Sequence, residues 1–355
     1  MTAGALSRRL AAQVVLAGFH GTGLPEWVAL ALRSGLAGIV LHRRNVDRAA
    51  QVAALAAEAR RVAPDALVAI DHEGGRVQWL GADAGFTAWP APRRMAAQGG
   101  PDEVRAAAAA MGRELRAVGV DLVLGPVLDV ATDALNPVME DRAFATDPLR
   151  VAALALAAAE GFAQAGVLTA GKHYPGHGDA RLQPAAAPRL PHDRARLDAV
   201  ELVPFRAAAR ARFPALVAAH LAAPALGDDL PASLSPAALR VLRAELGFDG
   251  CIATDDLESA SLTAFPAAPV EALRAGADLL VFGSRMKAVA DALGALAAEA
   301  TIGGDRRARL EDAAERVAAL RARVEPPEPL SGTALANALR LPEALSLAAR
   351  LGGGR

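Results

Sequence analysis

Residues 172–179 read KHYPGHGD, a stretch that combines groups able to carry charge or move protons with glycines that let a backbone approach a ligand. Lys172 is one of only two lysines in a chain with 38 lysines and arginines together. An ammonium group is a compact point charge, whereas a guanidinium is a wide planar fork. The stretch is therefore typical of a tight polar site, with Lys172 and His173 as candidate ligand contacts.

Acids and bases also follow four other apolar runs. They are Asp71 in DHEGGR, Asp129 with Arg142 in the next loop, His220, and the pair Asp255 and Asp256 in CIATDD. Carboxylates accept hydrogen bonds from hydroxyl groups, and Lys, Arg and His donate them. The spacing of these groups is not that of metal ligands, and the single Cys251 excludes a cysteine-based zinc site. The pattern favours a neutral polyhydroxylated ligand, with no metal and no cofactor.

Eight short apolar runs alternate with alanine-rich stretches of helical periodicity. The runs are residues 13–19, 37–41, 66–70, 120–128, 166–174, 215–221, 251–256 and 278–284. This alternation predicts a (β/α)₈ barrel, in which residues after each strand gather on one rim. A doubly wound sheet is the alternative, but it usually has fewer strands and needs a glycine-rich phosphate loop, to which GFHGTGLPE is only a weak approximation.

The composition bounds the class of protein. A hydrophobic fraction of 53% and a charged fraction of 22% are typical of a globular chain with a large core. A net charge of −1 argues against a nucleic-acid partner, and no apolar run reaches the roughly 18 residues of a membrane span. We therefore expect a cytoplasmic protein that acts on a small molecule. Its oligomeric state has no signature in the sequence.

A proline-rich break, PPEP at 326–329, divides the chain unequally. We expect a single barrel domain over residues 1–325, including additional helices after the eighth strand. Residues 326–355 form a C-terminal extension to which the sequence assigns no role.

Six stretches carry a resemblance to a known family. They are IDHEGGRVQ (70–78), PVLDV (126–130), NPVMEDRAFATDP (136–148), KHYPGHGD (172–179), AHLAAPALGDDLPASLSP (219–236) and LGFDGCIATDDLESAS (246–261). In this order, they resemble the motifs of glycoside hydrolase family 3, in particular its single-domain bacterial β-N-acetylhexosaminidases of peptidoglycan recycling. The resemblance implies a (β/α)₈-like barrel and a retaining mechanism acting on β-linked N-acetylglucosamine. It carries the nucleophile onto Asp255, and contacts with sugar hydroxyls onto Asp71, Arg142, Lys172 and His173.

The same resemblance implies an Asp-x-His proton donor shortly after KHYPGHGD, and here the chain departs from it. The corresponding residues are Gln183, Pro184 and Ala185, and the surrounding RLQPAAAPRL contains neither an acid nor a histidine. A retaining glycosidase needs an acid to protonate the departing oxygen as well as a nucleophile. His177 and Asp179 are the candidate substitutes. A second departure is His72, where the family more often has glutamine.

Other readings stay open at this point. His177 and Asp179 could instead fix their own loop, and one carboxylate of the Asp255–Asp256 pair is expected to be structural. His20, His42 and His192 are interpreted as ordinary histidines, and Trp27 and Trp79 as core or partly buried residues. Trp89, in GFTAWPAP on a loop after the third apolar run, could flank a sugar. A sugar-binding or regulatory pseudoenzyme is the alternative to an impaired glycosidase. A Schiff-base lyase using Lys172 is a third class.

Overall fold

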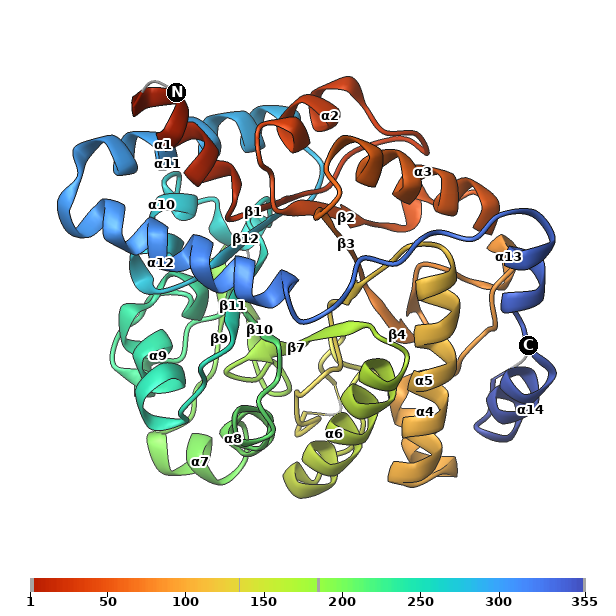
Figure 1. Ribbon diagram of the computed structural model, residues 1–355. Coiled ribbons are helices and arrows are strands. Elements are labelled where there is room, and N and C mark those ends of the chain that lie inside the picture. Colours follow the sequence, from red (N-terminus) through yellow and green to blue (C-terminus); the bar gives the residue numbers. More distant parts are fainter. Residues whose placement is uncertain (1–2, 134, 184–185, 354–355) are drawn as a thin grey trace.

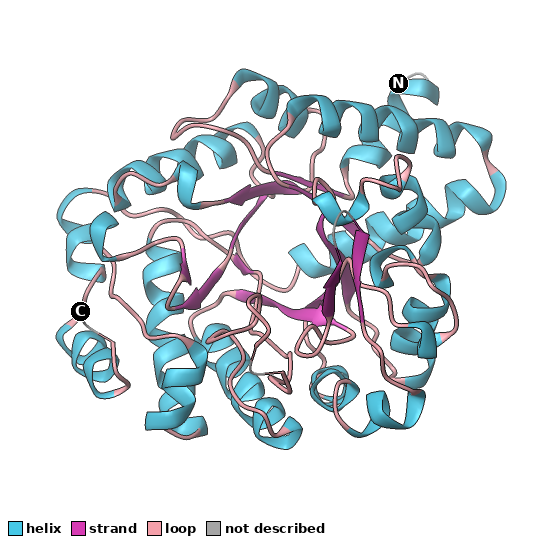
Figure 2. Ribbon diagram, turned by 180° about the vertical axis from the view of Figure 1, so that it is seen from behind, coloured by secondary structure: helices cyan, strands magenta, loops and turns pink. Residues whose placement is uncertain are grey.

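The protein, described by a computed structural model over residues 3–133, 135–183 and 186–353, is built around a closed barrel of eight parallel strands. Neighbouring strands follow the order β1–β12–β11–β10–β7–β6–β3–β2, and β2 closes the ring against β1. Figure 2 shows the ring surrounded by helices. The strands are β1 (Val15–Ala17), β2 (Gly38–Leu41), β3 (Leu67–Ile70), β6 (Leu122–Val123), β7 (Leu168–Tyr174), β10 (Ala215–Ala218), β11 (Cys251–Asp256) and β12 (Leu279–Phe282). The predicted (β/α)₈ barrel is confirmed.

Helices cover the outside of the barrel and extend past its last strand (Figure 1). They are α1 (Ala3–Ala12), α2 (Glu26–Arg33), α3 (Ala49–Val62), α4 (Pro92–Gln98), α5 (Pro101–Ala117), α6 (Pro148–Gln164), α7 (Arg194–Ala199), α8 (Leu202–Arg210), α9 (Pro236–Arg240), α10 (Ala268–Ala275), α11 (Met286–Ile302), α12 (Gly304–Arg321), α13 (Gly332–Ala338) and α14 (Pro342–Arg350). Two small antiparallel hairpins lie outside the barrel. They are β4 (His72–Gly74) with β5 (Val77–Gln78), and β8 (Arg181–Gln183) with β9 (Ala186–Arg189).

Local signals in the sequence explain where these elements begin and how closely they pack. In α6, the side chain of Asp147 accepts a hydrogen bond from the backbone N–H of Arg150, and Pro148 occupies the first turn.

Helices α5 and α6 approach closely at Gly161, where an added Cβ would lie 2.2 Å from the carbonyl oxygen of Arg105. Small residues on both helices, such as Gly161 and Ala108, therefore allow α5 and α6 to pack closely against each other.

The fourth barrel strand is shorter than predicted. The apolar run 120–128 contains only the two-residue strand β6, and Pro126, which follows it after a short gap, has no N–H to donate. Pairing then resumes at Leu128, whose N–H donates to the carbonyl oxygen of Lys172 over 2.6 Å. This interruption brings the loop after β6 close to the end of β7.

One end of the barrel is closed by a helix. Inside the barrel, side chains such as Val40, Leu122 and Leu279 form an apolar cluster that includes Val317 and Leu320 of α12. Helix α12 crosses the barrel in Figure 1. The strand ends at which the polar residues were predicted therefore lie at the opposite, open end.

The chain after α12 returns to the far side of the barrel, where α13 and α14 lie beside α4 and α5 (Figure 1). The backbone N–H of Arg340 donates to Glu114 on α5 over 2.7 Å. Glu114 is 3% exposed and also accepts from the backbone N–H and hydroxyl of Thr87. The C-terminal helices are thus attached to the barrel through a buried carboxylate as well as through apolar contacts.

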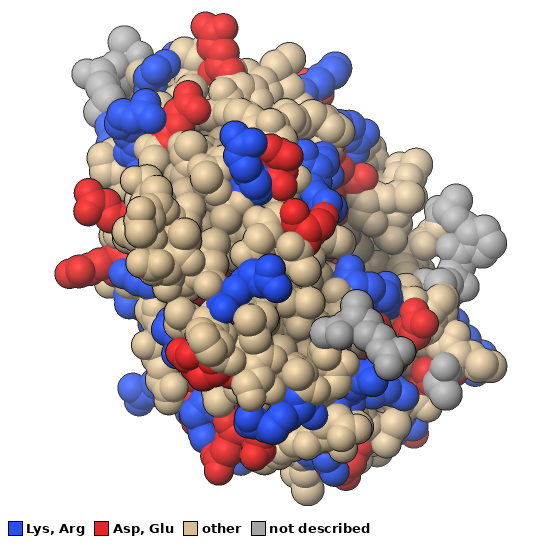
Figure 3. All heavy atoms as spheres, turned by 90° about the vertical axis from the view of Figure 1, so that its right-hand side faces the viewer, with Lys and Arg blue, Asp and Glu red and all other residues tan. Residues whose placement is uncertain are grey.

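The surface on this side carries both signs of charge. Figure 3 shows lysine and arginine interspersed with aspartate and glutamate over the visible face. Within residues 3–133, 135–183 and 186–353, the helices are all too short or too polar to cross a membrane.

Candidate active site

The polar strand ends meet in one pocket of about 290 Å³ at the open end of the barrel. That volume lies at the lower end of the range for small-molecule sites, ~300–1,000 Å³, and suits a ligand the size of one sugar ring. Six of the predicted site residues line the pocket: Asp71, Arg142, Lys172, His173, His177 and Asp255. The other described lining residues are Val40, His42, Val77, Trp79, Leu124, Val138, Val217, Thr254, Asp256 and Val281.

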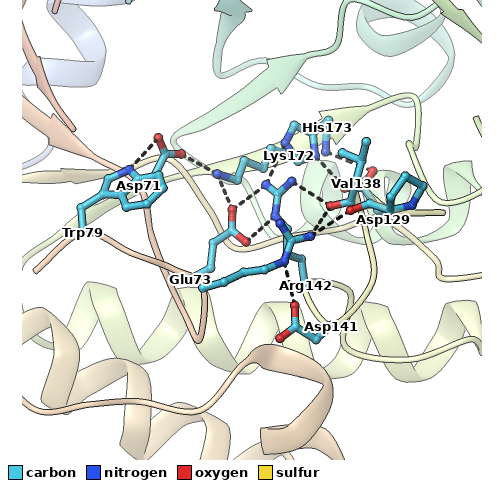
Figure 4. A network of polar contacts seen from close by, with 11 residues as sticks. Asp71, Glu73, Trp79, Asp129, Val138, Asp141, Arg142, Lys172 and His173 are labelled. Carbon is cyan, nitrogen blue, oxygen red and sulfur yellow. Dashed lines mark hydrogen bonds and ion pairs between the residues drawn. The ribbon is translucent and has the colours of Figure 1, made fainter. Parts of the chain in front are cut away.

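Glu73 holds two of the cationic groups together, although it does not line the pocket itself. It accepts two parallel hydrogen bonds from Arg142, at 2.8 Å from Nε and 2.7 Å from Nη2, and lies 2.6 Å from Nζ of Lys172. Figure 4 shows Glu73 between these two side chains. Burial alone would raise the pKa of Glu73, but Lys172 and Arg142 lower it to about 2. Glu73 is therefore an ionised carboxylate that fixes the positions of both cations.

Lys172 is held between two carboxylates. Its Nζ donates to Oδ1 of Asp71 over 2.6 Å as well as pairing with Glu73. Burial by itself lowers the pKa of Lys172, but Asp71 and Glu73 hold it above its ordinary value. The ammonium stays protonated, so it donates hydrogen bonds and is a poor nucleophile. This arrangement argues against a Schiff-base reaction at Lys172.

His173 is fixed by a partner on each ring nitrogen. Nδ1 lies 2.7 Å from Oδ2 of Asp129, and Nε2 lies 3.3 Å from Nη2 of Arg142. Because an arginine can only donate, Nε2 must accept this bond, and Nδ1–H donates to Asp129. The buried Asp129 thereby connects His173 to the same network as Arg142 (Figure 4).

The two neighbouring aspartates at the end of β11 differ in what they contact. Asp256 accepts the backbone N–H of Glu258 over 2.9 Å and packs against Gly283, where an added Cβ would be 2.3 Å from its Oδ2. Burial alone would raise the pKa of Asp255, but His220, His173, the N–H of Asp256 and Lys172 lower it to about 2. Asp255 is therefore the ionised carboxylate at the pocket, and Asp256 mainly holds its own turn.

His220 positions the backbone of this turn. Its Nε2 lies 2.9 Å from the carbonyl oxygen of Asp256, and its Nδ1 lies 2.7 Å from Oγ of Ser233. The carbonyl oxygen can only accept, so Nε2 carries the hydrogen and Nδ1 accepts from the serine hydroxyl. Burial lowers the pKa of His220, which keeps this neutral form.

The backbone around His177 is fixed on both sides. Its N–H donates to Oδ1 of Asp129 over 2.6 Å, and its carbonyl oxygen accepts from Nδ2 of Asn136 over 2.8 Å. At Gly178 an added Cβ would lie 1.6 Å from the carbonyl oxygen of Val130, so only glycine fits there. The imidazole of His177, by contrast, has no hydrogen-bond partner among the described residues, and its Nδ1 is buried. Burial lowers its pKa, with a further contribution from His173.

The side chain of Asp179 interacts with two basic residues rather than with the pocket. Its Oδ2 lies 2.6 Å from Nε2 of His192 and 3.8 Å from Nη2 of Arg196. It is not among the described residues that line the pocket. Gln183, Pro184 and Ala185 stand at the positions of the family's proton donor. Pro184, Ala185 and the side chain of Gln183 lie outside the described residues.

Sequence reasoning missed several residues of the site. Glu73 follows Asp71 by two positions, and the two-residue period of an extended chain would have placed both side chains on one face. His42 lines the pocket at the end of β2, although it was read as an ordinary histidine. His72, the second departure from the family's motifs, is 1% exposed, lies outside the pocket lining, and has a pKa lowered to about 3 by burial. Among the described residues, no cluster of three or more His, Cys, Asp or Glu side chains could hold a metal ion.

The comparison with protein families identifies most of the chain. Residues 24–320 match the model "Glycosyl hydrolase family 3 N terminal domain". A "Beta-hexosaminidase" from Methylococcus capsulatus is 40% identical over 273 residues, which cover 73% of this chain and 79% of the relative. A "Beta-hexosaminidase" from Pseudomonas aeruginosa is 40% identical over 260 residues, which cover 71% of this chain and 76% of the relative.

Solved structures agree with this assignment. A family 3 β-N-acetylglucosaminidase from Paenibacillus sp. superposes with a TM-score of 0.89 at 34% identity, covering 97% of this chain and 68% of that one. NagZ from Neisseria gonorrhoeae in complex with N-trifluoroacetyl-D-glucosamine superposes with a TM-score of 0.75 at 31% identity, covering 95% and 96%. The chain therefore belongs to glycosyl hydrolase family 3, a family of O-glycosyl hydrolases.

Proposed function

We propose that this protein is a retaining exo-β-N-acetylhexosaminidase that removes terminal β-linked N-acetylglucosamine from cell-wall-derived sugars. The observation that carries the proposal is the ionised Asp255 in the same pocket as Asp71, Arg142, Lys172 and His173. The names of the relatives and the N-acylated glucosamine bound to the gonococcal NagZ support this choice of sugar. A cytoplasmic location and a role in peptidoglycan recycling remain predictions.

The reaction follows from the placement of these groups. Hydroxyl groups of the sugar donate to Asp71 and accept from Arg142 and Lys172, while His173 contacts the sugar and holds Arg142 in position, and this binding brings the anomeric carbon to Asp255. The carboxylate attacks that carbon, the bond to the aglycone oxygen breaks, and a covalent glycosyl-enzyme forms. Water then hydrolyses this intermediate with net retention of configuration. The departing oxygen takes the bonding electrons and needs a proton unless it is already a stable anion.

His177 is the better candidate for supplying this proton. It lines the pocket with Asp255, its backbone is fixed, and its imidazole has no competing hydrogen-bond partner among the described residues. Asp179 is engaged by His192 outside the pocket lining. Because burial lowers the pKa of His177, most of the imidazole is neutral at neutral pH, and only a small fraction can act as an acid. We therefore expect weak catalysis on substrates with poor leaving groups.

The test is a series of β-N-acetylglucosaminides with different leaving groups. A dinitrophenyl glycoside should be cleaved slowly but measurably with retention of configuration, because its phenolate leaves without a proton. A methyl glycoside or a disaccharide should react far more slowly, since general acid help of ~10²–10⁴-fold is largely missing. Comparable rates on all substrates would show that an efficient proton donor exists and would contradict the proposed impairment.

Two matched variants separate the candidate donors. His177→Ala should reduce turnover of weakly activated aryl substrates more than that of the dinitrophenyl substrate, whereas Asp179→Asn should affect both equally and less. The reverse order would assign the proton to Asp179. Binding of N-acetylglucosamine without cleavage of any aryl substrate would favour the alternative function, a sugar-binding or regulatory pseudoenzyme that uses the same pocket.

A further inference from the structure

Trp79 contributes an aromatic wall to the pocket. It follows β5, is half-buried, and lies in the same lining as Asp71 and Asp255. The apolar part of the remaining lining is aliphatic, with Val40, Val77, Leu124, Val138, Val217 and Val281. Apart from histidines, Trp79 is the only aromatic side chain among the described lining residues. The indole therefore presents a flat apolar surface, whereas the other lining side chains are aliphatic, polar or charged.

The polar edge of the indole points to a carboxylate of the site. Nε1 of Trp79 lies 3.4 Å from Oδ2 of Asp71, while Oδ1 of Asp71 accepts from Lys172 over 2.6 Å (Figure 4). The two donors approach different oxygens and so define the plane of the carboxylate. An ionised carboxylate has about four lone-pair positions, so Asp71 keeps the capacity to accept hydroxyl groups from a ligand.

A sugar ring has chemistry that matches this wall. Its hydroxyl groups point outward around the edge, and its ring C–H groups form an apolar face that an aromatic ring can cover. Tryptophan supplies a large contact area with an apolar body and one N–H donor, which suits a site where one end is apolar and the other polar. Trp79 can thus contact the ring face while its N–H orients the carboxylate that accepts from the ring edge.

We propose that Trp79 is a sugar-binding residue whose indole stacks on the apolar face of the bound hexosamine and whose N–H orients Asp71. This inference rests on the proposed function, because it assumes that the pocket takes an N-acetylated sugar. Neither role belongs to Trp89, which is 3% exposed and lines a different groove beside Arg93, nor to Trp27, which lies on α2.

Intrinsic fluorescence provides a direct test, because only three tryptophans are present. Titration of the wild-type protein with N-acetylglucosamine should change the tryptophan emission. The change should persist in the control variant Trp27→Phe and disappear in Trp79→Phe, whose phenyl ring still permits binding. Persistence of the full emission change in Trp79→Phe would overturn the proposal.

Affinity and kinetics provide a second readout. Trp79→Leu keeps an apolar side chain but removes both stacking and the N–H, so the Kd for N-acetylglucosamine by calorimetry should rise at least ~10-fold, against a much smaller rise for Trp79→Phe. On an activated aryl substrate the KM should rise more than kcat falls. Wild-type affinity in a folded Trp79→Leu would also overturn the proposal. Failure of the wild-type protein both to bind N-acetylglucosamine and to cleave the aryl substrate would instead refute the proposed function, and this inference with it.

Discussion

Buried carboxylates occur at both ends of the barrel, and they are used differently. At the end covered by α12, Asp278 accepts the backbone N–H of Ile252 over 2.8 Å and is paired with Arg243 at 2.5 Å and Arg309 at 2.7 Å. Asp121 likewise accepts the backbone N–H of Val68 and pairs with Arg60, at 2.8 and 2.7 Å. Each of these carboxylates accepts a backbone N–H from a neighbouring strand and pairs with arginine. Its oxygens therefore already have hydrogen-bond partners within the protein.

At the open end, the carboxylates border a pocket instead. Asp71 and Asp255 line this pocket. Glu73 lies outside the lining and holds the cationic side chains of Arg142 and Lys172 in position. Buried carboxylates therefore stabilise the fold at the closed end, where their oxygens are all paired. At the open end they can bind a ligand, because some of their capacity to accept hydrogen bonds remains free. In this chain, the charge network with hydrogen-bonding capacity facing an accessible cavity is therefore the candidate functional site, and the networks at the closed end are structural.

The largest expected effect comes from removing the carboxylate that we propose as the nucleophile. Asp255→Ala should lower kcat/KM on a dinitrophenyl β-N-acetylglucosaminide by ~10³-fold or more, because the glycosyl-enzyme cannot form. Sodium azide should partly restore turnover by attacking from the vacated side, and the product should be the α-glycosyl azide. Wild-type-like rates in this variant would remove Asp255 from the mechanism.

The corresponding change at the closed end should act on stability instead. Asp278→Asn leaves Arg243 without a compensating charge and removes one of the two carboxylates that pair with Arg309, so the free energy of unfolding should fall by about 3–5 kcal/mol. The kcat of the molecules that remain folded should be unchanged. Urea denaturation measures the first quantity and active-site titration the second. Asp291→Asn, which breaks an exposed ion pair with Lys287, is the control and should cost less than about 1 kcal/mol.

The smallest expected effect is a pH dependence that originates at the open end. The pKa of Glu73 is about 2 in the folded protein, below its ordinary value of 4.5, so its ionised form stabilises the fold above pH 4.5. That stabilisation is lost as the pH falls from 4.5 towards 2. Between pH 6 and pH 3 the wild-type protein should lose about 2 kcal/mol through this group.

Glu73→Gln tests the origin of this slope, because the amide does not titrate. The variant should be less stable than the wild-type protein at pH 6, since Arg142 and Lys172 lose their shared carboxylate. Its unfolding free energy should then change less between pH 6 and pH 3. Parallel curves for the two proteins would mean that other groups cause the acid sensitivity.

The fold was predictable because the alternation of apolar strands and helices recurs eight times and needs no knowledge of distant contacts. The residues at the strand ends could be predicted for the same reason, since a barrel gathers them on one rim. Glu73 could also have been predicted, because it lies on the same face of the extended chain as Asp71. The short strand β6 could also have been predicted, because Pro126 lies inside the apolar run and has no N–H to donate to a neighbouring strand.

Other features depend on contacts that no local pattern contains. The interaction of Asp179 with His192 joins residues 13 positions apart across a hairpin, and the attachment of Arg340 to Glu114 joins positions 226 apart. The side chain of Trp79 was expected to be core or partly buried, and only the folded barrel brings its N–H to Asp71. Such contacts decide which titratable groups face a ligand, so the sequence alone could name candidates without ranking them.

The attachment of Arg340 to Glu114 also bears on how this chain can be engineered. The segment matched by the family model ends at residue 320, which makes that region an obvious place to truncate the protein or to join it to a fusion partner. A chain shortened there would remove one of the donors to a carboxylate that is 3% exposed and would uncover the apolar side of α5. Expression boundaries should therefore include α13 and α14, and tags are better placed at the amino terminus.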